Sequence, residues 1–193
     1  MNKTKILSIV FFIVALGLAY FLIDRIKFKI DEEDRIANVE RNVINKLKMI
    51  RDAQIAYRAV KGSYTSTPEK LIDFVKTGRI YITQKKEQII LLSYGRDSLV
   101  VQIDTLGTVS VMDSLFNERK YPNFDADRLL VIPGTGGKQF EMFADKIEKS
   151  GVSVDVFEVR DTDPVNPSRR LNNNERALRV GSKTDVTTSG NWE

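Results

Sequence analysis

The stretch ILSIVFFIVALGLAYFLI, which runs from Ile6 to Ile23, is the part of the sequence that decides the architecture. Its 18 residues carry no charge. A helix of this length rises about 27 Å, close to the hydrocarbon thickness of a bilayer. We therefore expect a transmembrane helix over residues 6–23, with side chains such as Phe12 and Leu16 facing lipid. The lipid bilayer is the first expected partner.

Two other interpretations of this stretch were weighed. A secretory signal peptide has an apolar core of roughly 7–15 residues and a small-x-small cleavage site. Gly17 and Ala19 supply that site only loosely, and the run is longer than such a core. A buried helix of a globular core would usually show a polar face, which this run lacks. An uncleaved anchor is favoured, although the sequence does not decide whether the segment is cleaved.

Basic residues lie on both sides of the run, and their number alone would slightly favour the opposite orientation, so the orientation is predicted from the short N-terminal tail and from the order of the charges that follow the run. Acidic residues 31–34 follow the basic ones on the C-terminal side, and a tail of residues 1–5 is easily retained in the cytoplasm. We expect a single-pass protein of a bacterial inner membrane, with a cytoplasmic N-terminus and a periplasmic C-terminal domain. The basic residues nearest the run are Lys3 and Lys5 before it and Arg25, Lys27, Lys29 and Arg35 after it.

The composition excludes several kinds of chemistry. The chain has no cysteine and no histidine, which removes thiol nucleophiles, disulfides and the commonest zinc ligands. No serine lies in a recognisable triad context, so we expect no enzyme and no catalytic residues. The net charge of +4, from 30 basic and 26 acidic residues, is too mild and too mixed to indicate nucleic-acid binding.

The helix is expected to continue beyond the membrane, over residues 24–61. No proline occurs before Pro68, and Gly62 provides a stop signal. Apolar residues recur at steps of three and four, so they form one stripe. The stripe could pack on the chain's own domain or, as a second reading, in a coiled coil between chains. Its members are Ile36, Val39, Val43, Ile44, Leu47, Ile50, Ala53, Tyr57 and Val60.

A head domain of α+β class is expected over residues 62–160. Thr67 and Pro68 have the order of a helix start, and Gly78 ends that short helix. An antiparallel β-meander should follow, with the long amphipathic helix covering its apolar face. Its strands are expected over 79–83, 88–93, 98–104 and 108–112, with turns at 94–97 and 105–107.

The last third of the chain predicts a strand-helix-strand unit and a tail. The strands are expected over 128–132 and 152–159, with a helix over 137–150 between them. Residues 161–193 form a polar, loop-rich tail, in which the single tryptophan, Trp192, is a plausible docking anchor.

The sequence IRDAQIAYRAVKGSYTSTPEKLIDFV, residues 50–75, joins the long helix to the short one. With the apolar run before it, it resembles the type IV pilin and pseudopilin family of secretion and motility systems over about residues 5–76. The resemblance implies an antiparallel head and makes Gly62, Tyr64 and Leu71 framework residues, together with Tyr57. A prepilin peptidase site needs a Gly followed by a hydrophobic residue, Thr, two further apolar residues and Glu. No such motif occurs between Met1 and Ile23, so a permanent anchor is expected.

The resulting functional hypothesis is a non-catalytic structural subunit of a bacterial envelope assembly. Other membrane or periplasmic subunits, including further copies of the chain itself, are the expected partners. The alternative is a membrane-tethered periplasmic binding module for a protein or ligand. Expected contacts of the long helix with partners involve Ile36, Val43, Leu47, Ile50 and Tyr57, and the span is marked by Ile6, Phe12, Leu16 and Ile23.

Three polar motifs have residue types that occur in ligand-binding sites. Residues 133–138, PGTGGK, lack the P-loop spacing, so a plain strand-to-helix turn is favoured. The carboxylates of Asp155, Glu158, Asp161 and Asp163 lack EF-hand spacing. No cofactor is expected, and calcium is kept as a candidate only because some pseudopilins carry it in a late loop. A basic cluster near Asn172–Asn174 could contact an acidic surface or lipid head groups; it comprises Arg169, Arg170, Arg176 and Arg179.

Overall fold

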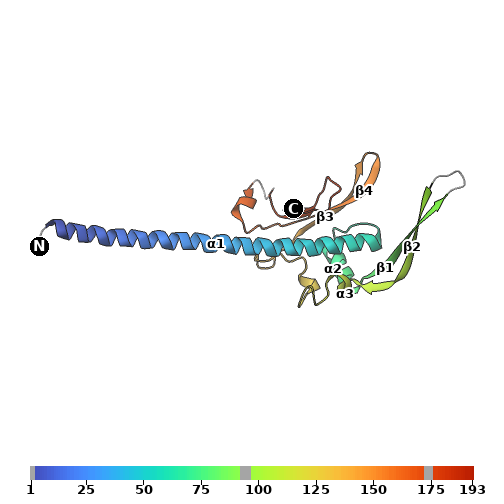
Figure 1. The fold of residues 1–193 in the computed structure, drawn as a ribbon, viewed down its shortest axis with the longest axis horizontal. Helices are drawn as coiled ribbons and strands as arrows, with labels where there is room; N and C mark the ends of the chain where they lie inside the picture. The colour runs from blue at the N-terminus through green and yellow to red at the C-terminus, as the bar shows by residue number, and fades with distance from the viewer. Residues whose placement is uncertain (1–2, 92–96, 172–175) are drawn as a thin grey trace. The chain divides into compact units, whose positions relative to one another are not determined.

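The fold is α+β, as expected, and is known from a computed structural model that describes residues 3–91, 97–171 and 176–193. Side chains are described for these residues except 3–6, 9, 90–91 and 97–100. Figure 1 shows the order of the elements. These are α1 (Lys3–Lys61), α2 (Pro68–Thr77), β1 (Arg79–Leu91), β2 (Asp97–Ser110), α3 (Val111–Leu115), η1 (Ala126–Arg128), β3 (Glu141–Lys149), β4 (Val152–Arg160), η2 (Pro167–Arg169) and β5 (Arg179–Gly181).

The chain divides into two compact units, Met1–Asn42 and Val43–Glu193. The first consists of the N-terminal part of α1, and the second, called the head here, contains the rest of α1 and all other elements. Within the described residues, no helix contains a stretch long and apolar enough to count as a membrane span.

Helix α1 confirms the expected continuous helix. Its 59 residues contain no proline, so nothing in the backbone interrupts the hydrogen-bond ladder. The helix ends where Gly62 adopts a φ of 84°, and the Gly62 amide donates to the Arg58 carbonyl at 2.8 Å. A left-handed residue after the last turn is the usual way to end a helix, and glycine adopts it without steric cost.

Helix α2 begins at Pro68, as the sequence predicts. Thr67 has the extended backbone of an N-cap residue, but its side chain makes no capping hydrogen bond. Its amide instead donates to the Thr65 hydroxyl at 3.1 Å. The helix buries Leu71, which is a predicted framework residue, together with Phe74 and Val75. The predicted helix and its start at Thr67 and Pro68 are therefore confirmed, although the Thr67 side chain does not cap the helix.

Strands β1 and β2 replace the expected four-stranded meander. They form a two-stranded antiparallel sheet, whose register pairs Arg79 with Ser110 and Leu91 with Asp97. Residues 84–87, which separated two predicted strands, contain no glycine, proline or asparagine that would turn the chain. The predicted turn at 105–107 is a bulge opposite Ile82 and Thr83. The other predicted turn falls on residues 94–96, which lie outside the described residues, and on Asp97, which begins β2.

The C-terminal end of the predicted meander is also corrected. Strand β2 ends at Ser110, and residues 111–115 form α3. Ser110 accepts a hydrogen bond from the Asp113 amide at 3.0 Å, which is the capping interaction that starts a helix. Helix α1 does not cover the sheet of β1 and β2, since the side chains of residues 81–89 are exposed.

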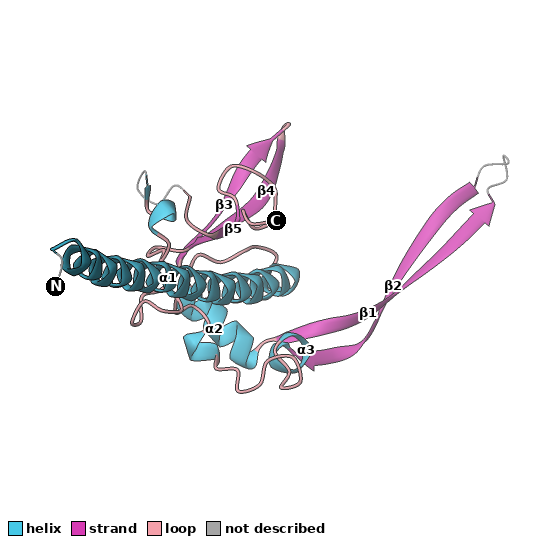
Figure 2. Cartoon of the chain, turned by 60° about the vertical axis from the view of Figure 1, so that its left-hand side comes forward, coloured by secondary structure: helices cyan, strands magenta, loops and turns pink. Residues whose placement is uncertain are grey.

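The expected strand-helix-strand unit is instead a three-stranded antiparallel sheet in the order β3-β4-β5, drawn separately from β1 and β2 in Figure 2. Residues 141–149 are a strand where a helix was expected, and residues 128–132 form no strand. Ser150 and Gly151 both have positive φ, at 55° and 77°. This two-residue hairpin turn pairs β3 with β4, and the ladder prevails over the weak helical periodicity of 137–150. The predicted strand over 152–159 is confirmed as β4.

The hydrophobic core of the head combines α1, α2 and β4 with the segments around η1 and β5. The C-terminal segment 161–193 contributes to it through β5 and the residues before it. Buried apolar residues are Val43, Leu47, Met49, Ile50, Ala53, Ala56, Leu71, Phe74, Val75, Val111, Phe116, Ala126, Leu129, Leu130, Ile132, Phe140, Val156, Phe157, Val159, Ala177, Leu178 and Val180.

Candidate interaction surfaces

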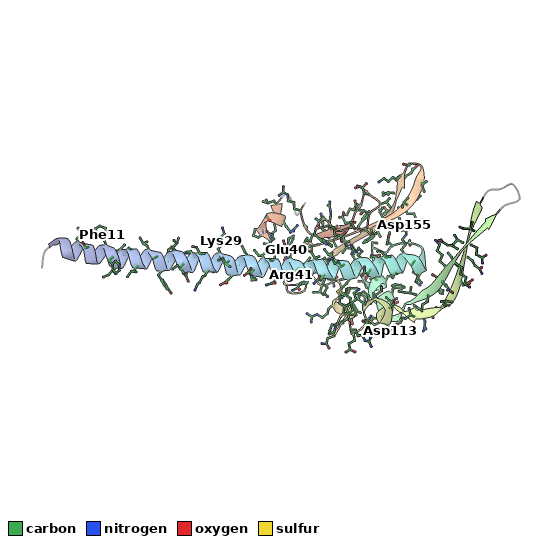
Figure 3. All side chains as sticks on the ribbon, in the orientation of Figure 1. Phe11, Lys29, Glu40, Arg41, Asp113 and Asp155 are labelled. Atoms are coloured by element: carbon green, nitrogen blue, oxygen red, sulfur yellow. The ribbon has the colours of Figure 1, made fainter. Side chains whose placement is uncertain are left out.

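The N-terminal part of α1 exposes large apolar side chains in every direction. Successive helical residues are rotated by about 100°, so the consecutive residues from Val10 to Val14 surround the axis. Figure 3 shows side chains around this helix near the labelled Phe11 and Lys29. We call the following residues, each at least 50% exposed, the apolar segment: Leu7, Val10, Phe11, Phe12, Ile13, Val14, Leu16, Leu18, Tyr20, Phe21, Leu22, Ile23, Ile26, Phe28 and Ile30.

Three of the four predicted span residues, Phe12, Leu16 and Ile23, belong to the apolar segment. The side chain of Ile6 lies outside the described residues. From Asp24 onward, charged residues lie among the apolar ones of the segment, and the Arg25 guanidinium lies 5.0 Å from the centre of the Phe21 ring. Arg35 then donates two hydrogen bonds to Glu32, at 2.8 and 2.7 Å. The helix therefore changes from apolar to charged within the first unit.

The predicted packing stripe is used inside the head. Val43, Leu47 and Ile50 are no more than 3% exposed, so they face this chain's own core. Tyr57 is half-buried, and its ring meets that of Phe74 edge-on, with centroids 5.1 Å apart. The own-domain reading of the stripe holds for these residues. Val43, Leu47 and Ile50 offer no surface to another subunit while the head is folded.

The predicted framework residues lie inside the head, at the junction where α1 ends and the chain turns toward α2. The Tyr64 ring contacts the Phe157 ring of β4, with centroids 4.6 Å apart. The Arg58 guanidinium lies over Tyr64 at 5.1 Å from the ring centre, and the same side chain reaches Asp155 at 3.7 Å. Leu71 is fully buried, whereas Gly62 is exposed and acts through its backbone. The junction is thus closed by aromatic contacts from both sides.

A hydrogen-bonded pair that the sequence reasoning missed also closes this junction. Gln54 is fully buried in α1. Its side chain donates to the Thr65 carbonyl at 2.6 Å and accepts from the Thr65 amide at 3.1 Å. One glutamine inside an apolar stripe was the only available signal.

A groove in the described head has a volume of about 910 Å³. Lys46 projects into it from α1, and its ammonium group donates to the Arg128 carbonyl. Burial lowers the pKa of Lys46, and the Arg128 charge adds to this effect, which Asp125 opposes. Further lining residues are Met49, Lys120, Tyr121, Pro122, Asn123, Phe124, Val131, Ile132, Pro133, Gly134, Gly136 and Gly137.

The late carboxylates do not converge on a common point. In the part of the chain that the structure describes, no group of three or more Asp, Glu, His or Cys side chains could hold a metal ion. Asp163 pairs with Lys138 at 3.1 Å. Asp161 accepts a hydrogen bond from the Asp163 amide at 2.9 Å, and burial raises the pKa of its carboxyl.

The glycine-rich loop at 133–138 is not a strand-to-helix turn, because β3 follows it. Its ends are joined: the Ile132 amide donates to the Lys138 carbonyl at 2.8 Å, and Val131 bridges to Gln139. The amide cradle at a helix N-terminus, which phosphate binding would use, is therefore missing here.

The basic cluster of the tail is held mainly by its own chain. Arg169 donates to the Arg176 carbonyl at 3.2 Å, and Arg170 donates to the Pro164 carbonyl. Arg179 is half-buried in β5. Asn172–Asn174 lie outside the described residues.

The C-terminus contacts α1, as the idea of a docked tail suggests. Glu193 pairs with Arg51 at 2.7 Å. Trp192 is half-buried, and its ring lies against Gly190, where a Cβ atom would be 2.3 Å from the ring. The indole nitrogen is buried without an acceptor among the described residues.

Comparison of the chain with known protein families, with curated proteins and with solved structures gave no match.

Proposed function

We propose that this protein is a non-catalytic, membrane-anchored structural subunit of a bacterial envelope assembly, with its N-terminus in the cytoplasm and its head in the periplasm. The observation that carries the proposal is the apolar segment of α1. Twelve of its fifteen side chains lie within residues 6–23, and burying them in lipid removes them from water, at roughly 25 cal/mol for each Å² buried. No face of residues 6–23 carries a charge, so packing against a single protein surface would leave part of this apolar run in water.

The sequence gives this proposal its span. The uncharged run includes Ile6 and Ile9, whose side chains lie outside the described residues. Charged side chains begin at Asp24, where a helix leaving the hydrocarbon would need them.

The junction supports the pilin-like part of the proposal. A helix that carries a periplasmic head needs tight packing between its C-terminal end and the elements that follow it. Tyr57 on Phe74, Tyr64 on Phe157 and the buried Leu71 provide such packing at the end of α1. The missing prepilin peptidase site agrees with a subunit that stays anchored.

Contacts with other subunits must use surfaces other than the buried stripe. Val43, Leu47 and Ile50 are occupied by the head, which leaves Ile36, partly exposed in the first unit, as the stripe residue nearest the membrane. Exposed strands of the head are the other available surface.

Fractionation of cells that express the full chain tests the anchor. We expect the protein to stay in the membrane pellet after extraction with alkaline carbonate and to dissolve only in detergent. As a control, Leu16→Asp with Ile13→Asp should release it, because two charges at mid-span oppose insertion. Complete release of the unmodified chain by carbonate would overturn the proposal.

The absence of native cysteine allows the orientation to be tested with single cysteines. Ser63→Cys places an exposed thiol in the head, and Thr4→Cys places one before the span. A membrane-impermeant maleimide should label Ser63→Cys in intact spheroplasts and Thr4→Cys only after lysis. The reverse pattern would show that the head is cytoplasmic.

The groove beside Lys46 favours the alternative of a tethered binding module. Lys46 and Arg128 place positive charge in a cavity that also contains the Tyr121 and Phe124 rings, a combination suited to an anionic aromatic or acidic peptide ligand. Lys46→Gln should weaken such binding, whereas Lys48→Gln on the same helix should not. If Lys46→Gln abolishes function in cells while assembly is unchanged, this alternative is preferred.

A further inference from the structure

Strand β1 has one paired edge and one unpaired edge. Its 13 residues pair with β2, and in the described chain no other strand joins their sheet. The side chains of residues 81–89 are all exposed. A long, unpaired strand edge is a template for another strand.

The sequence along this edge is close to a palindrome in chemical terms. When TQKKEQI, residues 83–89, is set antiparallel to a second copy about Lys86, Lys85 lies opposite Glu87 of the second copy. Gln84 then meets Gln88, and Thr83 meets Ile89. Each pair occurs twice, because a two-fold axis repeats it. Opposite charges and matched amides are the cross-strand pairs that stabilise a sheet.

The backbone groups that β1 directs outward are the ones that this register requires. The Val111 amide donates to the Gly78 carbonyl at 3.0 Å, so even-numbered residues of β1 direct their backbone groups toward β2 and odd-numbered ones direct theirs outward. The bulge skips Leu106 of β2 and inserts nothing into β1. Lys85 and Glu87 therefore present free amide and carbonyl groups at the outer edge, where the two copies would exchange hydrogen bonds.

On the two-fold axis, Lys86 would lie opposite Lys86 of the second copy. A carboxylate of β2 within the same chain offsets the repulsion between these two lysines. The Lys86 ammonium lies 3.0 Å from Asp104 of β2, and Gln102 donates to the same carboxylate at 3.0 Å. Two lysines at the axis would thus be flanked by two aspartates, so that charges alternate across the sheet.

The face of the β1-β2 sheet opposite to Lys86 also favours pairing with another strand. Lys85 pairs in register with Ile103, and Glu87 pairs with Val101, so these four side chains share a face. Ile103 and Val101 are 65% and 41% exposed. Isolated two-stranded sheets are marginally stable in water, whereas sheets of more strands with an apolar face are stable.

We propose that β1 pairs with β1 of a second copy of this chain, in antiparallel register about Lys86, to form one four-stranded sheet. The occupant of the edge is the chain itself because the edge complements its own sequence. The proposal does not depend on the membrane anchor, and it adds a defined self-contact to the proposed structural role.

Disulfide trapping of the full chain in its membranes tests the register. Lys86→Cys places two thiols at a pair whose Cα atoms are about 4.5 Å apart, within the range for a disulfide. Gln88→Cys lies on the same face of β1, but its two copies would be about 13 Å apart along the strands. Gln102→Cys is the cross-strand neighbour of Lys86 on β2. No native cysteine competes.

We expect mild oxidation to give dimers with Lys86→Cys at a rate at least about tenfold above that of Gln88→Cys and Gln102→Cys, since only the first pair falls within bonding range. Equal rates for Lys86→Cys and Gln88→Cys would overturn the register. Faster dimerisation of Gln102→Cys would assign the contact to β2 and overturn the proposal. If Lys86→Cys gave no dimer while Trp192 fluorescence showed that the protein is folded, the proposal would also be overturned.

A charge swap on the Lys86→Cys background separates specific pairing from collision. Lys85→Glu and Glu87→Lys should each slow disulfide formation, by about 2- to 10-fold for two like-charge pairs. The double variant should restore the original rate, because every pair is again of opposite charge. All these positions are exposed, so the head should stay folded. Single swaps without effect, or a double variant slower than both, would contradict the proposal.

Discussion

Gln54 and Thr65 are joined by two hydrogen bonds that close the turn between α1 and α2. The glutamine amide donates to the Thr65 carbonyl at 2.6 Å and its oxygen accepts from the Thr65 amide at 3.1 Å. Both residues are buried, so water cannot replace either bond. The pair fixes where the chain turns back, and thereby where α2 packs on the stripe of α1.

Gln54→Ala should lower the free energy of unfolding of the head by about 2–4 kcal/mol, because it leaves a buried amide and a buried carbonyl without partners. Urea unfolding in detergent, followed by the fluorescence of the single tryptophan, measures this change. Gln88→Ala removes an exposed glutamine of β1 and is the control. Equal effects of the two substitutions would show that the buried pair contributes little.

Leu47→Ala should destabilise the head by about 2–5 kcal/mol, the usual cost of removing a buried leucine side chain. Leu47 is 0% exposed, whereas Ile55 on the same helix is 44% exposed. Ile55→Ala is therefore the matched control, and it should cost less than about 1 kcal/mol. Thermal unfolding by circular dichroism compares them. If Leu47→Ala left stability unchanged but reduced crosslinking between subunits, the stripe would serve partners after all.

Gly181→Ala should destabilise the head by more than about 2 kcal/mol, since strain and a steric clash coincide there. Gly181 has a φ of 76°, and a Cβ atom would lie 2.1 Å from the Phe157 carbonyl oxygen. Gly136 also has a positive φ, at 70°, but has nothing within 4 Å of its Cβ position. Gly136→Ala should cost about 1 kcal/mol. Urea midpoints of the two variants would be equal only if β5 could shift.

The buried carboxyl of Asp161 should make stability depend on pH. Burial raises its pKa in the folded state above the usual value of 3.8, so the folded state binds more protons than the unfolded state between these two values. Its contribution to stability is then present at low pH and lost as pH rises through the raised pKa.

Asp161→Asn removes this titration and keeps an oxygen to accept from the Asp163 amide. The variant should therefore gain stability relative to the parent chain at pH 7, and the gain should shrink as the pH falls toward 4. Unfolding free energies across this range measure it. A gain that grows on acidification would mean that the positive charges of Arg169 and Arg170, which lower the pKa of Asp161, outweigh burial.

The parts of the fold that depend on neighbouring residues were predictable from sequence. Helix α1, its end at Gly62 and the start of α2 at Pro68 follow from the lack of proline, from a glycine and from a proline. Strand β4 contains enough β-branched residues for a strand to be predicted from its sequence. The exposed run 84–87 was wrongly predicted as a break between two strands, because its glutamine, two lysines and glutamate carry no clear strand signal, and pairing with β2 decided its conformation.

Among the candidate residues, Phe12, Leu16 and Ile23 were found exposed and Leu71 buried, as their patterns implied. Gln54 was not found, because a polar residue within a helical stripe gives no hint of its partner. The strand β3 was predicted as a helix because its local periodicity was read without the Ser150-Gly151 turn that pairs it with β4.

The sequence by itself determined the uncharged run of residues 6–23, the long helix that contains it and the absence of cysteine and histidine. Only the tertiary structure decided what the amphipathic stripe contacts. An apolar stripe specifies that it must be buried but not against what, since the hydrophobic effect has no direction. Here the α2 and β4 side chains bury the stripe within one chain. The tertiary structure also decided that the outer edge of β1 has no partner strand in the described head.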